Sequence, residues 1–216
     1  IFGSFIGTRI GQMGGFDYMQ FMAPGLIMLA VITNAYSNVV SSFYGVKFSK
    51  SIEELLVSPM PTYLILLGFV AGGVVRGILV GILVMVTSLL FTDIHVQNIP
   101  LTLLVIFLTA VLFSLAGLLN AIFADSFDDI NIVPTFVLTP LIYLGGVFYS
   151  ITLLSETWQI ISKLNPVLYM VNAFRYGMLG VSDINVSVAI GMILFFIIIF
   201  YSLSLYILKK GIGIRS

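Results

Sequence analysis

The chain has 216 residues, of which 60% are hydrophobic and only 8% are charged, and its mean hydropathy is +1.17. A soluble domain carries roughly 25% charged residues, so this composition excludes an ordinary soluble protein and a disordered one. Nine basic and nine acidic residues give no net charge, which excludes the basic field that holds nucleic acid. The composition leaves a membrane protein.

Cysteine is absent and His95 is the one histidine in the sequence. This excludes a disulfide framework, a thiolate metal site and a thiol nucleophile within the sequence, and it disfavours a histidine-based metal centre. We therefore expect no metal site. The first residue is Ile rather than Met, so we expect the sequence to begin inside a longer protein.

Long charge-free stretches mark the expected membrane-spanning segments. A helix needs about 20 apolar residues to cross the hydrocarbon core, and unbroken apolar blocks favour helices over a barrel. The predicted crossings cover residues 20–45, 72–91, 99–123, 130–150 and 186–208, and residues 1–8 are predicted to end an earlier crossing. The sequence thus predicts an all-α polytopic membrane protein. A single domain over 1–216 would be a six-crossing helical bundle with a truncated first crossing.

The third crossing lies in an apolar run that is too long for one straight span. Residues 61–91 would form a helix of about 46 Å, whereas the hydrocarbon core is about 30 Å thick. We expect an interfacial stretch over 61–71, a break at Gly72 and Gly73, and Arg76 near the inner end, where its stem can reach water. A buried cation facing a substrate path is the alternative. Glycines at 73, 77 and 81 predict close approach of another helix.

Orientation follows from the basic residues near the ends of the crossings. With the C-terminus in the cytoplasm, the inner side holds Lys47, Lys50, Lys209, Lys210 and Arg215, and the outer side holds Arg9, Lys163 and Arg175. This excess of positive charge favours a cytoplasmic loop between the second and third crossings.

That loop, KFSKSIEELLVSPMP, predicts a short amphipathic helix over residues 51–58. Ser51 and Glu54 have the spacing of a capping box, Ile52 and Leu55 share a face, and Ser58 before Pro59 favours a stop. Two interpretations remain open. The helix rests on the membrane interface, or it docks into a groove on a soluble partner.

Three aspartates, Asp125, Asp128 and Asp129, lie between the fourth and fifth crossings. Carboxylates suit hard cations, but the loop is short and has no EF-hand pattern. A solvated turn that caps the next helix is the better interpretation.

The longest outer segment, residues 151–185, predicts two short helices. The first covers 155–163 with Ser155 as its cap, and the second covers 166–179, with Pro166 at its first position and Gly180 just past its end. Both are too short to span the bilayer, so they are external or re-entrant. Asn172 and Arg175 share one face of the second helix, which is either a surface cap or an outer gate.

Polar side chains form stripes inside two of the crossings. Residues four apart share a helix face, and such stripes are either hydrogen-bonding contacts between helices or the wall of a wet or substrate-filled cavity. The stripes contain Thr33, Ser37 and Ser41 with Asn34, Asn38 and Ser42 beside them, and Thr135, Thr139 and Tyr143. Pro140 and the pair Gly145 and Gly146 would let the fifth helix bend.

The source of energy is not visible in this chain. No Asp or Glu lies within a predicted crossing and no GxxxxGK[ST] motif is present, so the sequence offers neither the usual proton-carrier carboxylate nor an ATP-binding P-loop. A separate protein is expected to supply the energy. The alternative is a self-sufficient channel or an ion-coupled secondary transporter. A membrane enzyme is disfavoured because no polar catalytic cluster is present.

Several segments resemble one family, the transmembrane permease subunits of ABC type-2 exporters. FMAPGL at the second crossing, SIEELLVSPM at the inner loop, and TPLIYLGGVFY followed by LNPVLYMVNAFRYGMLG are similar to the family's segments in the same order, over nearly the whole chain. One departure is that Lys47 and Lys50 stand where relatives often carry arginines.

The resemblance implies a non-catalytic subunit of an exporter in the bacterial inner membrane, a multi-pass protein whose partners are an ATP-binding cassette ATPase, a second permease copy and the lipid bilayer, but no nucleic acid. It implies no cofactor on this chain, with ATP and Mg bound by the partner ATPase. The coupling helix would comprise Ser51, Ile52, Glu53, Glu54, Leu55, Leu56, Ser58 and Pro59. The substrate path would be lined by Thr33, Asn34, Ser37, Asn38, Ser41, Thr135, Thr139 and Tyr143, and the re-entrant outer gate by Asn165, Pro166, Tyr169, Asn172 and Arg175.

Overall fold

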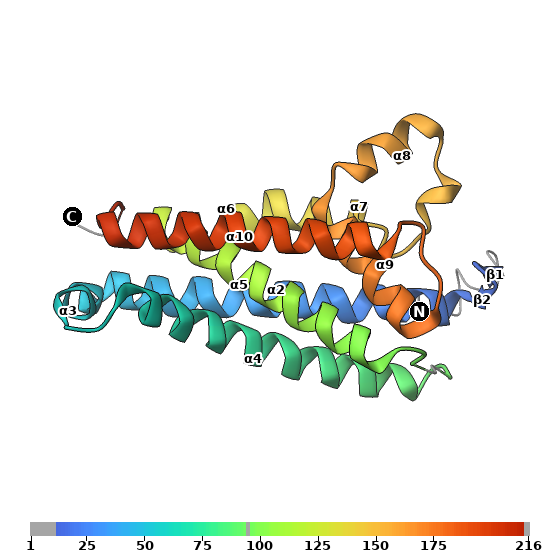
Figure 1. The fold of residues 1–216 in the computed structure, drawn as a ribbon, viewed down its shortest axis with the longest axis horizontal. Coiled ribbons are helices and arrows are strands. Elements are labelled where there is room, and N and C mark those ends of the chain that lie inside the picture. The colour runs from blue at the N-terminus through green and yellow to red at the C-terminus, as the bar shows by residue number, and fades with distance from the viewer. Residues whose placement is uncertain (1–11, 94–95, 214–216) are drawn as a thin grey trace.

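The computed structural model describes residues 12–93 and 96–213, and within them the chain is an elongated helical bundle (Figure 1). Its long helices are α2 (Tyr18–Phe48), α4 (Thr62–Leu89), α5 (Ile99–Phe123) and α10 (Val186–Lys210). All four are long and apolar enough to cross a membrane. The predicted crossing over 1–8 lies outside the described residues.

Shorter elements close the two ends of the bundle. The helix α3 (Ser51–Val57) lies at one end, where α10 also finishes, and we call this the α3 end (Figure 1). The opposite end, which we call the α8–α9 end, carries α8 (Glu156–Lys163), α9 (Pro166–Leu179) and the hairpin of β1 (Gln12–Met13) and β2 (Phe16–Asp17). The inner loop and the C-terminal end therefore lie at the same end of the molecule, as the basic residues predicted.

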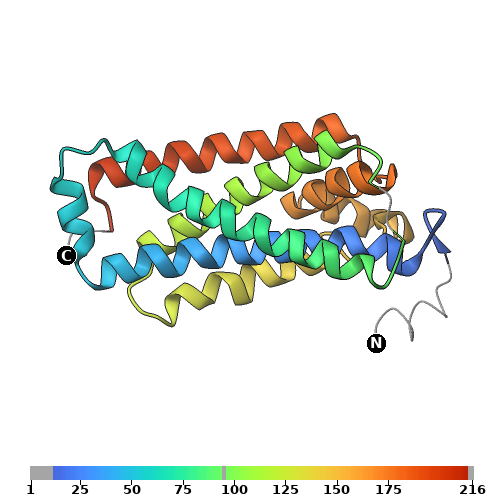
Figure 2. The same ribbon diagram turned by 90° about the horizontal axis from the view of Figure 1, so that it is seen from below.

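The expected break in the third crossing is wrong. One continuous helix, α4, runs from Thr62 through Gly72 and Gly73 to Leu89, so residues 61–71 are not a separate interfacial stretch. Gly73 stays helical because its missing side chain lets α4 press against α2 and α5, where a Cβ would meet Val39, the Ala35 carbonyl and Ser114. The predicted close approach at the three glycines is thus confirmed. A helix longer than the bilayer is thick is accommodated by tilting, and α4 crosses α2 obliquely (Figure 2).

The fifth crossing is shorter than expected. Its helical run consists of α6 (Asp129–Val133), the π-helix η1 (Pro134–Leu138) and α7 (Thr139–Leu144), so it ends six residues before position 150. The run stops because Gly146 adopts a left-handed conformation with φ of +74°. Close packing fixes this turn, since a Cβ on Gly25 of α2 would meet the Val147 backbone. Pro134 and Pro140 are accommodated in part by the π-helix, where the hydroxyl of Thr139, the first residue of α7, donates to the Pro134 carbonyl over 2.8 Å.

The remaining helix bounds lie near the predicted ranges. A helix covers 99–123 as expected, α10 extends two residues past 208, and α2 extends beyond 20–45 at both ends. A 3-10 turn, η2 (Ile151–Leu153), precedes α8, and Ser155 stands at the cap position of α8 without a side-chain hydrogen bond. Asn165 caps α9 by accepting from the Val167 N–H over 3.0 Å, and Gly180 ends it at φ of +74°. Local turn chemistry fixes these ends.

The α8–α9 end is asymmetric. The helix α8 projects from the bundle (Figure 1) and exposes Trp158 and Ile160. The helix α9 packs against α2, α5 and α10 and is largely buried. The interpretation of α9 as a surface cap is therefore wrong, because its middle is enclosed by the three long helices.

Candidate transport site

The helix α3 is fixed to the bundle by one side and open on the other. Ile52 is buried against the hydrophobic core, while Ser51, Glu54 and Val57 are exposed, Val57 by 82%. The predicted capping box is wrong. Ser51 is already the first helical residue and Lys50 takes the cap position with φ of 59°, which places the Ser51 hydroxyl 3.1 Å from Ser49 instead of on a helix N–H.

The stop of α3 is as predicted. Ser58 is extended, its backbone N–H donates to the Glu54 carbonyl over 3.1 Å, and its hydroxyl donates to the Leu55 carbonyl over 2.7 Å. A cavity of about 300 Å³ lies between α3 and the start of α4, lined by Leu55, Met60 and Ile65 among others. A short amphipathic helix thus stands at the end of the bundle with a mixed polar and apolar surface facing outward.

The base of α3 is held by a charged contact that the sequence did not reveal. Lys47, near the end of α2, donates to the last carbonyls of α5, Ile122 over 2.7 Å and Ala124 over 2.8 Å. Its ammonium group also lies 3.9 Å from the exposed Asp125 carboxylate. A cation at a helix C-terminus satisfies carbonyls that have no partner within the helix and complements the helix dipole. The end of α2, from which α3 departs, is therefore tied to α5.

The aspartate turn after α5 is closed by hydrogen bonds to Asp129, the first residue of α6. Asp129 accepts from the backbone N–H groups of Asp125 over 3.1 Å and Ser126 over 2.9 Å. The Ser126 side chain, and then these backbone groups, lower the pKa of Asp129 from its ordinary value. Within the described ranges, no three His, Cys, Asp or Glu side chains gather as a metal site would require.

The two polar stripes lie on the outside of the bundle. Thr33, Asn34 and Asn38 are half-buried, whereas Ser37, Ser41, Thr135, Thr139 and Tyr143 are exposed. The helix α4 lies along one side of α2, and the run of α6, η1 and α7 along the other (Figures 1 and 2). We call this surface the polar face. It comprises Thr33, Asn34, Ser37, Asn38 and Ser41 on α2 and Thr135, Thr139 and Tyr143 on the run from α6 to α7.

The hydrogen bonds of the polar face stay within single helices. Thr33 donates to the Leu29 carbonyl over 2.8 Å and Asn34 to the Ala30 carbonyl over 3.0 Å. Among the described residues, no stripe residue hydrogen-bonds to another helix. Hydrogen bonding between helices of the described chain therefore does not explain the stripes. The exposed stripe residues place polar groups on the outer surface of the bundle.

Arg76 lies in a different place from that predicted. Because α4 begins at Thr62 and ends at Leu89, Arg76 stands at the middle of the helix, about 20 Å from either end at about 1.5 Å per residue. It is exposed. The expectation that it lies near the inner end is wrong, since no break shortens the helix before it.

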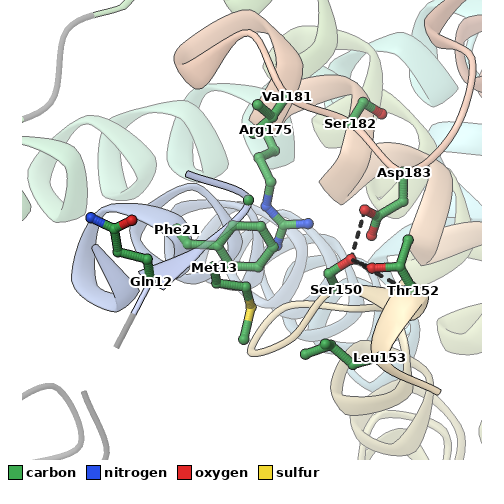
Figure 3. A pocket seen from close by; sticks show the side chains of 11 residues that line it. Gln12, Met13, Phe21, Ser150, Thr152, Leu153, Arg175, Val181, Ser182 and Asp183 are labelled. Carbon is green, nitrogen blue, oxygen red and sulfur yellow. Dashed lines mark hydrogen bonds between the residues drawn. The ribbon is translucent and has the colours of Figure 1, made fainter. Parts of the chain in front are cut away.

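A second arginine, Arg175 of α9, is 1% exposed and lies at the α8–α9 end. Its guanidinium stacks 3.9 Å above the Phe21 ring of α2, and Nη2 donates to the Gly146 carbonyl over 2.7 Å. It lines a cavity of about 410 Å³ between the β1–β2 hairpin, the turn at Ser150 and the loop after α9 (Figure 3). Within the described chain, Nε and Nη1 have no hydrogen-bond partner.

Asp183 also lines this cavity, and sequence reasoning did not single it out (Figure 3). Its carboxylate accepts from the Ser150 hydroxyl over 2.7 Å and the Ile151 N–H over 3.0 Å. Its own N–H donates to Asn172 over 2.9 Å. A lone aspartate in an irregular loop has no periodicity that would have marked it.

The five predicted gate residues tie α9 to its surroundings. The Asn165 amide donates to the Leu141 carbonyl of α7 over 2.6 Å, and the Tyr169 hydroxyl donates to the Lys163 carbonyl of α8 over 2.8 Å. Pro166 occupies the first position of α9. With Asn172 and Arg175, these residues join α9 to α7, α8 and the loop at Asp183.

Within the described residues, four long apolar helices with short helices at both ends define an all-α polytopic membrane protein. The comparison with known families specifies it further. The model of the family described as ABC-2 type transporter matches residues 1–179, so the chain belongs to the ABC-2 type transporter family. It is a multi-pass inner-membrane protein and a permease subunit of an ABC transporter, a class that works with an ATP-binding partner.

Curated relatives are similar over most of their length. The inner membrane transport permease YadH of Escherichia coli K12 is 57% identical over 216 residues, which is all of this chain and 84% of that protein. Nodulation protein J of Rhizobium leguminosarum biovar viciae is 24% identical over 209 residues, or 96% of this chain and 81% of that protein. No solved structure matches significantly.

Proposed function

We propose that this chain is the non-catalytic permease of an ABC exporter and that a second copy pairs with it, so that the path runs between two polar faces. The single observation that carries the proposal is the exposure of the polar face along α2 and the run from α6 to α7. Polar groups exposed to hydrocarbon are unfavourable, so such a face is better placed against a partner or a substrate than against lipid.

The helix α3 is proposed to receive the force of the ATPase. Its anchor Ile52 is buried, its outer residues Glu54 and Val57 are exposed, and Lys47 ties its base to α5. An element held rigidly at its base transmits a push to the helices it joins, α2 and α4. ATP and Mg would be bound by the partner ATPase, and no cofactor is expected on this chain.

The outer gate is proposed to be α9 with its hydrogen bonds to α7 and to the loop at Asp183. Asn165 reaches the Leu141 carbonyl of α7, and Arg175 reaches the Gly146 carbonyl in the turn just after it. A displacement of α7, which carries part of the polar face, would therefore move α9. The direction of transport, export, is proposed from the resemblance to ABC type-2 exporters.

Coupling is tested by reconstituting the full-length permease with its ATPase and measuring both co-purification and ATP hydrolysis. The double substitution Glu54→Arg with Val57→Asp is expected to reduce both, because it changes charge and apolar contact on the exposed side of α3. The matched control is Glu156→Arg with Leu164→Asp, two exposed positions at the α8–α9 end. Full coupling in the α3 variant would refute the docking role.

Direction and pairing need separate measurements. Inverted vesicles that carry α3 outward should accumulate a panel of fluorescent dodecyl amphiphiles on addition of ATP if the protein exports, and should lose them if it imports. A cysteine placed at Ser37 should form a cross-link between two permease copies. Absence of that cross-link in an active complex would refute the paired polar faces.

A further inference from the structure

We propose that Arg76 is an anion-binding residue of the transport path, and that the transported molecule carries an oxyanion, either phosphate or carboxylate, which contacts this guanidinium at the middle of the bilayer. The inference rests on the proposed function, since it assigns a substrate class to the proposed path. It is carried by the depth of Arg76, its lateral position and the distribution of acidic residues.

The positions of Arg76 and its neighbours relative to α2, α4 and α5 all place Arg76 near the middle of the bundle. It lies halfway along α4. Its neighbour Gly77 packs against Ala35, which is near the middle of α2, and Gly73, one turn away, packs against Ser114 of α5. An arginine near a helix end reaches the headgroups with its stem, but about 20 Å of helix on either side places this one out of reach of both surfaces.

The packing of α4 on α2 also fixes the lateral position. A Cβ on Gly72 would lie 3.5 Å from Oδ1 of Asn38. The two helices are antiparallel, because α3 joins the end of α2 to the start of α4. One turn from Gly72 toward the α8–α9 end is Arg76, and one turn from Asn38 in the same direction is Asn34. Arg76 therefore stands beside Asn34, at the edge of the polar face rather than on the side of α4 that is remote from α2.

A guanidinium at this depth is costly if it faces lipid. Insertion of arginine at a helix centre costs about 2.5–3.5 kcal/mol on translocon scales, and such residues face a bundle interior or a water-filled cavity and pair with another group. Within the described chain, Arg76 makes no salt bridge and no hydrogen bond. The Asn34 and Asn38 side chains on the neighbouring helix are neutral, so they do not balance the positive charge.

This sequence offers no carboxylate at the depth of Arg76. Its acidic residues are Asp17, Glu53, Glu54, Asp93, Asp125, Asp128, Asp129, Glu156 and Asp183, all outside α2, α4, α5 and α10. A second copy of these residues would bring the same distribution. The charge complement is therefore best supplied by the transported molecule, because arginine forms strong, directional hydrogen bonds with carboxylate and phosphate.

Access to Arg76 is tested with single-cysteine variants in a cysteine-free full-length complex. The anionic, water-soluble thiol reagent MTSES should modify Arg76→Cys at least tenfold faster than Val75→Cys. Val75 is at the same depth and 58% exposed, but it points away from α2, about 100° around the helix. Equal rates, or protection of both positions as would follow if another transmembrane segment covered Arg76, would overturn the proposal.

Charge selectivity is tested in the same reconstituted complex with added amphiphiles. Dodecyl phosphate and laurate represent the two oxyanions, and dodecyl maltoside is the neutral amphiphile with the same chain. In wild type and Arg76→Lys, at least one anionic amphiphile should alter ATPase activity at about tenfold lower concentration than the maltoside. Arg76→Gln should lose this preference, while the control Val75→Gln should keep it.

The result separates this inference from the proposed function. If Arg76→Gln keeps the preference while the α3 double variant still uncouples ATP hydrolysis, the permease assignment stands and the anion site is refuted. A response to dodecyl phosphate alone identifies a phosphate site, and a response to laurate alone identifies a carboxylate site. If Arg76→Gln does not assemble, Arg76→Lys and the MTSES rates decide the question.

Discussion

Arg76 and Arg175 are both cations within the helical bundle, but their surroundings differ. Arg175 is enclosed at the α8–α9 end, stacked on Phe21 and bonded to the Gly146 carbonyl. Arg76 is exposed at mid-length of α4, and within the described chain it bonds to nothing. A buried cation with protein partners stabilises a fold, whereas an exposed one at this depth needs a partner from elsewhere. The difference separates a cation held by protein groups from one for which we propose a ligand.

The largest expected effect comes from exchanging each arginine for leucine. Arg175→Leu should lower the free energy of unfolding by about 2–4 kcal/mol, because the Gly146 carbonyl loses a charged donor and the stacking on Phe21 is lost. Arg76→Leu should change it by less than about 0.5 kcal/mol, as is usual for an exposed site. Unfolding in detergent, followed by tryptophan fluorescence, measures both. Comparable losses at the two positions would remove the distinction.

The two sides of α4 offer the next comparison. Gly73→Ala should destabilise by about 1–3 kcal/mol, since a Cβ there would overlap Val39 and the Ala35 carbonyl. Gly68→Ala should be neutral or stabilising by up to about 1 kcal/mol, because no atom lies within 4 Å of its Cβ position and alanine is the better helix former. The same unfolding assay applies. A stable Gly73→Ala protein would mean that α4 can move away from α2.

These contrasts also show which features the sequence could predict. The ends of α9 were readable because Asn165, Pro166 and Gly180 act through local backbone geometry. The packing of α4 was predicted in part, since glycines four residues apart indicate a closely packed neighbouring helix. The location of Arg76 was not predicted, because it depends on whether the helix breaks at Gly72 and Gly73. That is decided by contacts with α2 and α5, which no local pattern encodes.

The same limit applies to the functional sites. The stripe on α2 was visible from its four-residue spacing, but its exposure depends on which helices flank it. The pairing of Asp183 with Ser150 joins residues 33 positions apart, and the contact of Lys47 with Ile122 joins residues 75 apart. Such long-range polar contacts depend on the assembled bundle, and neither residue type nor spacing predicted them.

Lys47 extends the comparison to a cation at the α3 end. Like Arg175 it is satisfied by carbonyls, those of Ile122 and Ala124, so Lys47→Met should lower the free energy of unfolding by about 1–2 kcal/mol. Lys50→Met should have little effect, because Lys50 is exposed. If the two variants were equally stable, the contact with the end of α5 would not hold the base of α3, and the proposed route of force from α3 to the bundle would lose its support.

Asp129 provides the smallest and last comparison. Its carboxylate accepts hydrogen bonds from backbone N–H groups, whereas the Lys47 ammonium donates to backbone carbonyls. Its pKa lies below the ordinary value of 3.8 because of hydrogen bonds from the Ser126 side chain and then from the backbone of Asp125 and Ser126. A carboxyl with a lowered folded pKa contributes stability that is fully present above its unfolded pKa and is lost as pH falls through the folded pKa. The wild type should therefore be slightly more stable than Asp129→Asn at pH 6, and this difference should shrink as pH falls below the ordinary carboxyl pKa and vanish below the folded pKa of Asp129. Thermal unfolding of both proteins across that range measures the difference. A gap that persisted unchanged at low pH would show that the Asp129 charge is irrelevant to the turn and that hydrogen-bond geometry alone holds it.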